Sequence, residues 1–109
     1  MGKTAATPAP PYYAVIFTSM RTPQDNGYAQ TAARLLDLVR EQPGFLGVEA
    51  ARGNDLGLTV SYWDSLDSAA AWKQNLEHLQ AQAKGREKWY SEYSLRVARV
   101  EKEVRFQRD

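Results

Sequence analysis

The sequence contains no cysteine and a single histidine, His78, among its 109 residues. The absence of cysteine excludes disulfides, zinc–cysteine sites, iron–sulfur clusters and thiol nucleophiles, and a cytosolic protein is the simplest expectation. One histidine without cysteine also argues against a transition-metal site made of protein ligands alone. Phosphate-binding loops, Rossmann glycine fingerprints and nucleophile elbows are missing as well. A chemistry that needs no cofactor therefore fits this inventory best.

Long apolar runs and an excess of one charge are also missing. No stretch approaches the roughly 20 apolar residues that a membrane span needs, and the start of the chain lacks the apolar run of a signal peptide. The 14 Lys and Arg residues interleave with 13 Asp and Glu residues, for a formal net charge of +1. Because no strong positive field results, we expect neither nucleic acid nor a membrane as a partner.

The first 11 residues, MGKTAATPAPP, are small, polar and rich in proline. Such a segment buries too little apolar surface to offset the entropy lost when it is ordered. We therefore expect a flexible tail over residues 1–11 and a single domain over residues 12–109, since a chain of this length forms one domain.

From Tyr12 onward the hydrophobic pattern predicts the order strand, helix, strand, strand, helix, strand. Alternating or β-branched runs predict strands, and apolar residues at helical spacing predict two helices that are closed by glycines. The expected strands cover residues 12–19, 45–52, 56–64 and about 95–106, and the expected helices cover 28–39 and the segment from the capping serines at 65–68 to Gly85. This order is that of the α+β ferredoxin-like βαββαβ fold, a four-stranded antiparallel sheet with both helices on one face.

Both faces of the predicted sheet carry apolar side chains. In the first strand Ala14 and Ile16 point to one side, whereas Val15 and Phe17 point to the other. Leaving the side without helices in water would forgo about 25 cal/mol per Å² of apolar area. We therefore expect a second copy of the chain to cover it, with a bound ligand or another protein as the alternatives.

Three segments carry a specific resemblance to a known family. QPGFLGVEAAR (42–52), LTVSYWDSLDSAAAWKQNLEH (58–78) and GREKWYSEYSLRVARV (85–100), in this order of elements, resemble the antibiotic biosynthesis monooxygenase family of dimeric α+β barrels. The "PGF" before the second strand and the "YW.S…A…W" that runs into the second helix are the diagnostic parts. The resemblance implies a homodimer whose sheets face one another, with a pocket between the sheet and the helices of each subunit.

The resemblance leaves the reaction open, because members of this family divide in chemistry. One branch oxygenates anthrone-like aromatic molecules without metal or flavin, another binds and cleaves haem, and others act on small quinones or signalling molecules. In the haem-cleaving branch the iron ligand is a histidine about one turn beyond His78, where this chain has Gln82, and an asparagine of the first strand is replaced here by Phe17. Both differences argue against haem.

His78 and Asn75 are the candidate catalytic residues. Imidazole titrates near neutrality, so His78 could remove a proton from a phenol or an activated carbon. The amide of Asn75 could donate a hydrogen bond to a developing oxyanion. The structural alternative is that both side chains lie at the edge of the helix, in solvent or bonded to a loop.

Six further residues are candidates for substrate binding. Indole rings would supply flat walls for an aromatic ligand, phenols would orient it, and an arginine would hold an anionic group. The indole rings are those of Trp63, Trp72 and Trp89, the phenols are those of Tyr62 and Tyr90, and the arginine is Arg86. The structural alternatives are core packing for the aromatic rings and capping of the helix C-terminus for Arg86.

Together these features predict a cytosolic homodimer that oxygenates a small aromatic or quinone-like molecule without a bound metal or other cofactor. In such a reaction the substrate loses a proton and then supplies the electrons to O₂, so the protein has to bind, exclude water and stabilise negative oxygen. Two alternatives remain. One is a haem-binding or haem-degrading protein, and the other is a non-catalytic dimeric ligand-binding or stress-response domain.

Overall fold

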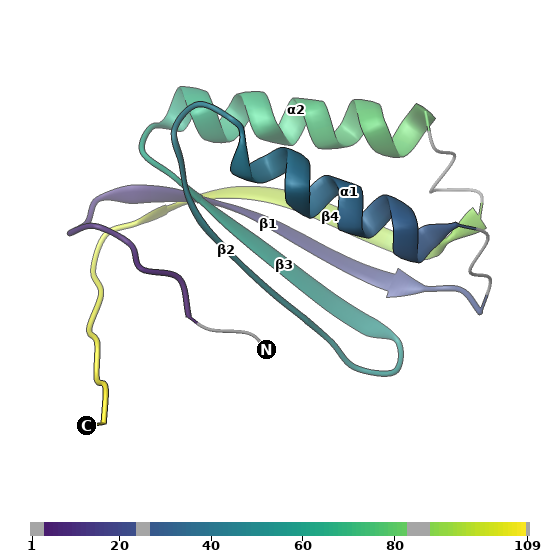
Figure 1. The fold of residues 1–109 in the computed structure, drawn as a ribbon, viewed down its shortest axis with the longest axis horizontal. Helices are drawn as coiled ribbons and strands as arrows, with labels where there is room; N and C mark the ends of the chain where they lie inside the picture. Colours follow the sequence, from purple (N-terminus) through teal and green to yellow (C-terminus); the bar gives the residue numbers. More distant parts are fainter. Residues whose placement is uncertain (1–3, 24–26, 83–87, 109) are drawn as a thin grey trace.

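The computed structural model describes residues 4–23, 27–82 and 88–108. It contains β1 (Tyr12–Arg21), α1 (Tyr28–Arg40), β2 (Phe45–Arg52), β3 (Leu56–Trp63), α2 (Leu66–Gln82) and β4 (Tyr90–Val100). The strands form an antiparallel sheet in the order β2-β3-β1-β4, and both helices lie on one face of it (Figure 1). The predicted ferredoxin-like βαββαβ fold is confirmed. Neither of these helices is long and apolar enough to cross a membrane.

The inner strand β1, which pairs with β3 and β4, shows which side chains face the helices. Val15 of β1 lies between Ser61 of β3 and Val97 of β4, and Val15 is buried in the core cluster beneath α2. Because side chains alternate along a strand, Ala14 and its neighbour Tyr62 point to the opposite side. We call this opposite side, which carries no helix, the open face.

The core lies between α2 and the sheet. Trp63 is fully buried, with 0% exposure, and it stacks on Trp72 of α2 with ring centroids 6.0 Å apart. The indole N–H of Trp63 donates a hydrogen bond to Ser61 Oγ at 2.9 Å, so the one polar atom of this ring is satisfied. Ala69 and Leu76 continue the buried side of α2. The helix α2 packs on β1, β3 and β4, whereas α1 lies over β2.

The turn before β2 is tied to the start of α2. Gly44 has φ +84°, a conformation that glycine adopts without steric cost, and a Cβ at this position would overlap the side chains of Ser68 and Asp64. The backbone N–H of Asp64 donates to Gly44 O at 2.9 Å. At the same place the N–H of Ser68 donates to Ser65 Oγ at 3.1 Å, which confirms the predicted helix cap.

The last strand begins and ends earlier than the sequence predicts. The expected strand runs from about residue 95 to 106, but β4 spans Tyr90–Val100. Val100 pairs with Tyr12, the first residue of β1, and Tyr90 pairs with Arg21, the last. The prediction is therefore wrong at both ends. At the C-terminal end the alternation of charged and apolar residues continues past Val100, but β1 has no further residue to pair with there.

The two terminal segments lie on the side of the sheet away from the helices (Figure 1). Residues 4–11 and 101–108 form neither helix nor strand. Arg105 joins them, because its Nη2 donates to Ala5 O at 2.6 Å and to Thr7 Oγ1 at 2.9 Å. We call these two segments the arms.

The arms cover only one end of the open face. Beneath them Tyr12 is 4% exposed, and its phenol is hydrogen-bonded to Glu103. At the other end Leu56 and Leu58 of β3 remain 50% and 43% exposed. The predicted apolar character of both faces is therefore present in the structure.

Candidate functional site

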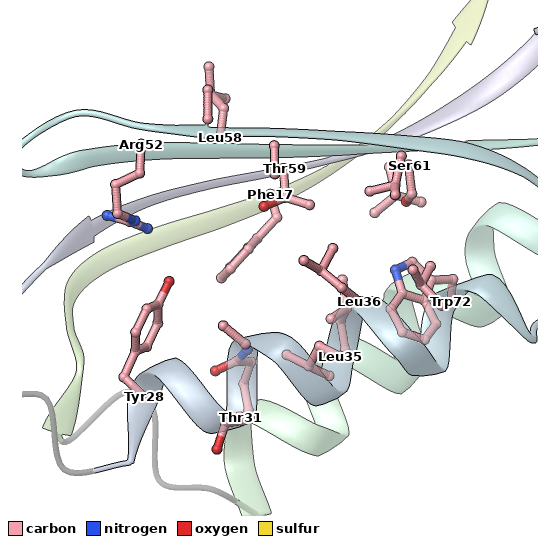
Figure 2. Close-up of a pocket in the computed structure, with 18 of the residues that line it drawn as sticks. Phe17, Tyr28, Thr31, Leu35, Leu36, Arg52, Leu58, Thr59, Ser61 and Trp72 are labelled. Atoms are coloured by element: carbon pink, nitrogen blue, oxygen red, sulfur yellow. The ribbon is translucent and has the colours of Figure 1, made fainter. Parts of the chain in front are cut away.

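A cavity of about 330 Å³ lies between the sheet and the helices. In Figure 2 side chains of the sheet, such as Phe17 and Thr59, and side chains of α1, such as Leu35 and Leu36, point toward one another across it. Trp72 of α2 lies at one end of the cavity. The volume falls within the range of about 300–1,000 Å³ that is usual for small-molecule sites.

Small side chains on two strands create this space. The helix-facing positions of β2 and β3 beneath α1 hold Val48, Ala50, Thr59 and Ser61, which pair with each other across the two strands. None of these side chains is long enough to fill the gap below α1, so the leucines of α1 meet a hollow instead of a packed layer. The surrounding walls are mostly apolar: Val15, Phe17, Ala32, Leu35, Leu36, Val39, Trp72, Leu76 and Trp89.

Arg52, the last residue of β2, brings a positive charge to the mouth of the cavity. Its Nη2 donates to Ser19 Oγ at 2.6 Å and its Nη1 donates to Asp55 O at 2.8 Å. Gly57 lies against the guanidinium, since a Cβ at Gly57 would overlap it. No Asp or Glu side chain within the described residues forms an ion pair with Arg52. The charge is thus held in place by neutral oxygens and stays available to an anion.

Two phenols stand beside this arginine. The hydroxyl of Tyr28, at the start of α1, points toward Arg52 (Figure 2), and Arg21 lies over the Tyr28 ring, 3.5 Å from its centroid. The ring of Tyr90 meets that of Tyr28 edge to face, with centroids 5.9 Å apart. Burial raises the pKa of Tyr90, and the charge of Tyr28 and a hydrogen bond between the two phenols raise it further. The positive charges of Arg52 and Arg21 act in the opposite direction. At neutral pH this phenol is therefore protonated and can donate a hydrogen bond.

The polar groups of the cavity are cationic or neutral. The described lining includes no Asp, Glu or His, and nowhere in the described chain do three or more His, Cys, Asp or Glu side chains come together to hold a metal ion. The site can therefore stabilise a negative charge on a ligand, but none of these lining groups is an ordinary base.

Gln80 is a buried polar residue of the cavity that the sequence analysis missed. It follows Trp72 and Leu76 at four-residue spacing, so these three residues share one side of α2, and all three line the cavity. Gln80 is 1% exposed, and its Oε1 has no hydrogen-bond partner among the described residues. The four-residue spacing from Trp72 and Leu76 is the sequence signal that could have indicated it.

The structure brings together three of the predicted substrate-binding residues. Trp72, Trp89 and Tyr90 line the cavity. Trp63 lies beneath Trp72 in the core, outside the lining. Tyr62 points to the open face, where its hydroxyl donates to Glu49 Oε1 at 2.6 Å. Burial and this hydrogen bond raise the pKa of Tyr62.

The two predicted catalytic residues lie elsewhere on α2. The side of the helix that carries Trp72 and Leu76 faces the cavity, and neither Asn75 nor His78 is among the described residues of its lining. Asn75 is half-buried and His78 is exposed. Their convergence on the cavity is not observed, although a role in catalysis stays a prediction. Arg86 lies outside the described residues, and its role as an anion holder stays a prediction as well.

Comparison with known sequences decides the family. A profile of the antibiotic biosynthesis monooxygenase family matches residues 11–84. The uncharacterized Bacillus subtilis protein YqjZ is 52% identical over 102 residues, which cover 93% of this chain and 90% of YqjZ. The chain belongs to the antibiotic biosynthesis monooxygenase family. The resemblance seen in the sequence is thereby confirmed.

Solved structures of low sequence identity share the fold of this family member. A Deinococcus radiodurans protein assigned to the antibiotic biosynthesis monooxygenases superimposes with a TM-score of 0.70 at 10% identity, over 87% of this chain and 98% of its own. SnoaB, a cofactor-independent oxygenase from Streptomyces nogalater, superimposes with a TM-score of 0.57 at 18% identity, over 80% of this chain and 92% of its own. At such identities the likeness concerns the fold.

Proposed function

We propose that this antibiotic biosynthesis monooxygenase family member is a cytosolic, homodimeric, cofactor-independent monooxygenase of a small aromatic or quinone-like molecule. The observation that carries this proposal is the cavity between α1 and the sheet. It is apolar along its walls, and Arg52 is the charged residue of its described lining. The similarity in fold to SnoaB, a cofactor-independent oxygenase, supports the proposal.

The proposed ligand is a flat apolar molecule with an ionisable oxygen. Phe17, Leu36 and Trp72 offer aromatic and aliphatic surfaces to its body. Arg52 and Tyr28 offer a cation and a phenol to the oxygen at the mouth. Because the charge of Arg52 favours the anionic form of a nearby group, binding lowers the pKa of the ligand.

The proposed reaction uses the ligand as its own electron source. Loss of a proton from an anthrone or hydroquinone leaves an enolate-type anion, whose negative oxygen Arg52 and Tyr28 stabilise. The anion passes one electron to O₂, and the resulting radical and superoxide combine to form a carbon–oxygen bond. The peroxide takes up a proton and loses water, so one oxygen atom stays in the product as a carbonyl and the other leaves as water. The chain binds the ligand, excludes solvent and holds the anion.

The dependence of kcat on pH tests where the proton goes. Since the described lining holds no Asp, Glu or His, we expect the proton to leave to water and kcat to rise with pH as the bound substrate ionises. The apparent pKa of kcat is expected to lie below that of the free substrate, because Arg52 stabilises the anion. The measurement is oxygen uptake over a range of pH with anthrones and hydroquinones of different acidity.

His78→Ala separates this route from the predicted role of His78 as the base: an unchanged pH profile supports loss of the proton to water. A loss of about tenfold or more in kcat would instead make His78 the base. Tight binding without oxygen uptake would support a non-catalytic ligand-binding domain. A Soret band on addition of haemin that His78→Ala abolishes would support the haem-binding alternative.

The proposed homodimer covers the open face. Leu56 and Leu58 are half exposed there, and Val104 and Phe106 of the arm 101–108 are 95% and 81% exposed. A second copy that packs its own open face against this one would bury both sets of side chains, because a twofold dimer brings the same patch of each subunit together. Neither the cavity nor its mouth lies on this face, so each subunit keeps its own site.

A charge at the exposed end of the open face is expected to weaken the dimer. Leu56→Glu places a carboxylate where the second copy is proposed to pack, and we expect the dimer dissociation constant to rise at least tenfold, or about 1.4 kcal/mol. Leu66→Glu is the matched control, since Leu66 is 54% exposed but belongs to α2. Light scattering during size exclusion at micromolar concentrations measures both. A wild-type monomer, or equal effects of the two substitutions, would contradict this assembly.

A further inference from the structure

Gln80 lines the cavity and carries a buried hydrogen-bond acceptor that has no partner among the described residues. The residue is 1% exposed, and its Oε1 lacks a partner among the described residues. Its neighbours along the same side of α2 are the apolar side chains of Leu76 and Trp72. A buried side-chain oxygen without a hydrogen bond is rare and costs stability. Leucine or methionine would fill the same volume without this cost.

Gln80 and Arg52 belong to different walls of the cavity. Arg52 ends β2, which is an edge strand of the sheet. Gln80 lies on α2, which packs on β1, β3 and β4. A ligand in this cavity therefore has a cation on the sheet side and the Gln80 side chain on the helix side, and apolar side chains such as Phe17 and Leu35 line the same space.

We infer that the ligand carries a second polar group, a hydroxyl or N–H, that donates a hydrogen bond to Oε1 of Gln80. This inference rests on the proposed function, because it takes the cavity as the ligand site. It narrows the ligand class to flat aromatic molecules with two polar groups, an ionisable oxygen for Arg52 and a hydrogen-bond donor for Gln80. Dihydroxylated aromatics and hydroquinones meet both requirements, whereas aromatics with one hydroxyl meet only the first.

Two probes that differ by one donor test this selectivity. Under anaerobic conditions, which prevent turnover, 1,4-dihydroxynaphthalene is expected to bind wild-type protein at least about tenfold more tightly than 1-naphthol. The diol is the less apolar of the two, so burial of apolar surface alone would give the opposite order. Gln80→Leu removes the acceptor with little change in volume, and it is expected to abolish the preference. Arg52→Met is the control, which should weaken both probes alike and leave their ratio unchanged.

The thermal stability of the unliganded protein provides a second readout. If Gln80 is kept for a ligand, Gln80→Leu removes an unsatisfied buried acceptor and raises the Tm. If Gln80 is a structural residue, the same substitution lowers the Tm. Gln80→Met serves the same purpose should the branched leucine fail to pack.

The outcomes separate this inference from the proposed function. Equal binding of the two probes by the wild type, or a Tm that is unchanged or lower in both Gln80→Leu and Gln80→Met, overturns the role of Gln80 and leaves the cavity as the site. Binding of neither probe overturns the proposed ligand class, and the inference with it. A preference for the diol that Gln80→Leu removes, together with a higher Tm, supports the inference.

Discussion

Arg52→Met is expected to lower kcat/KM for an anthrone or hydroquinone by about 10- to 100-fold, because a hydrogen bond to a charged group contributes about 1.5–3 kcal/mol. Methionine keeps much of the apolar stem but loses the guanidinium that faces Tyr28 across the mouth of the cavity. Arg52→Lys is expected to recover only part of the loss, since an ammonium group cannot reproduce the two hydrogen bonds to Ser19 Oγ and Asp55 O. Steady-state oxygen uptake measures all three proteins.

Two glycine substitutions test whether the position of the Arg52 charge matters, in addition to its presence. A Cβ on Gly57 would overlap the Arg52 guanidinium, whereas a Cβ on Gly53 would come no closer than 3.8 Å to its nearest described neighbour, Leu56 O. We therefore expect Gly57→Ala to displace the guanidinium and lower kcat/KM, and Gly53→Ala to have little effect. Equal activity of the two alanine variants, or an Arg52→Met protein as active as wild type, would show that Arg52 does not act on the substrate.

Gly44→Ala is expected to destabilise the fold more than substitution of any other glycine among the described residues. The φ of +84° at Gly44 costs a non-glycine residue about 1–2 kcal/mol, and the overlap of a Cβ with Ser68 and Asp64 adds the cost of overpacking, about 1–3 kcal/mol. The free energy of unfolding should therefore fall by about 2–5 kcal/mol, which corresponds to a Tm lower by about 10 °C or more. Chemical and thermal denaturation measure the two quantities.

Gly27→Ala is the matched control for this effect. Gly27 also has a positive φ, +88°, but a Cβ there would meet nothing within 4 Å among the described residues. Its substitution should therefore cost only the backbone term, about 1–2 kcal/mol. The difference between the two variants measures how tightly the turn before β2 is packed against the start of α2. Equal losses of stability would show that this packing contributes nothing.

The fold could be predicted because its local signals agree with its tertiary structure. The β-branched run that begins at Tyr12 forms an inner strand of the sheet, and the link between Arg52 and Leu56 forms the hairpin that its glycine and polar residues indicate. The predicted bounds of the last strand were wrong because they depend on the length of the partner strand β1. Val100 is the last residue with a partner in β1, at Tyr12, and no local pattern records that limit.

The candidate site could be predicted only in part. The aromatic residues Trp72 and Trp89 stand out in composition, and both line the cavity. Arg52, Tyr28 and Gln80 were missed because they come from the end of a strand, the start of one helix and the side of another. Each is an ordinary residue in its own segment. Only tertiary packing brings them around one space, and the small helix-facing side chains of β2 and β3 are the sequence signal that indicates such a space.

The most direct test of the proposed site is an NMR titration of the protein with an anthrone or a naphthalenediol in the absence of oxygen. The indole N–H signals of Trp72 and Trp89 and the backbone amides of Leu35 and Leu36 belong to residues that line the cavity. We expect these signals to shift together with one dissociation constant, which Arg52→Met raises. Shifts confined to the open face, or no shift at millimolar ligand, would contradict the claim that the cavity binds the substrate.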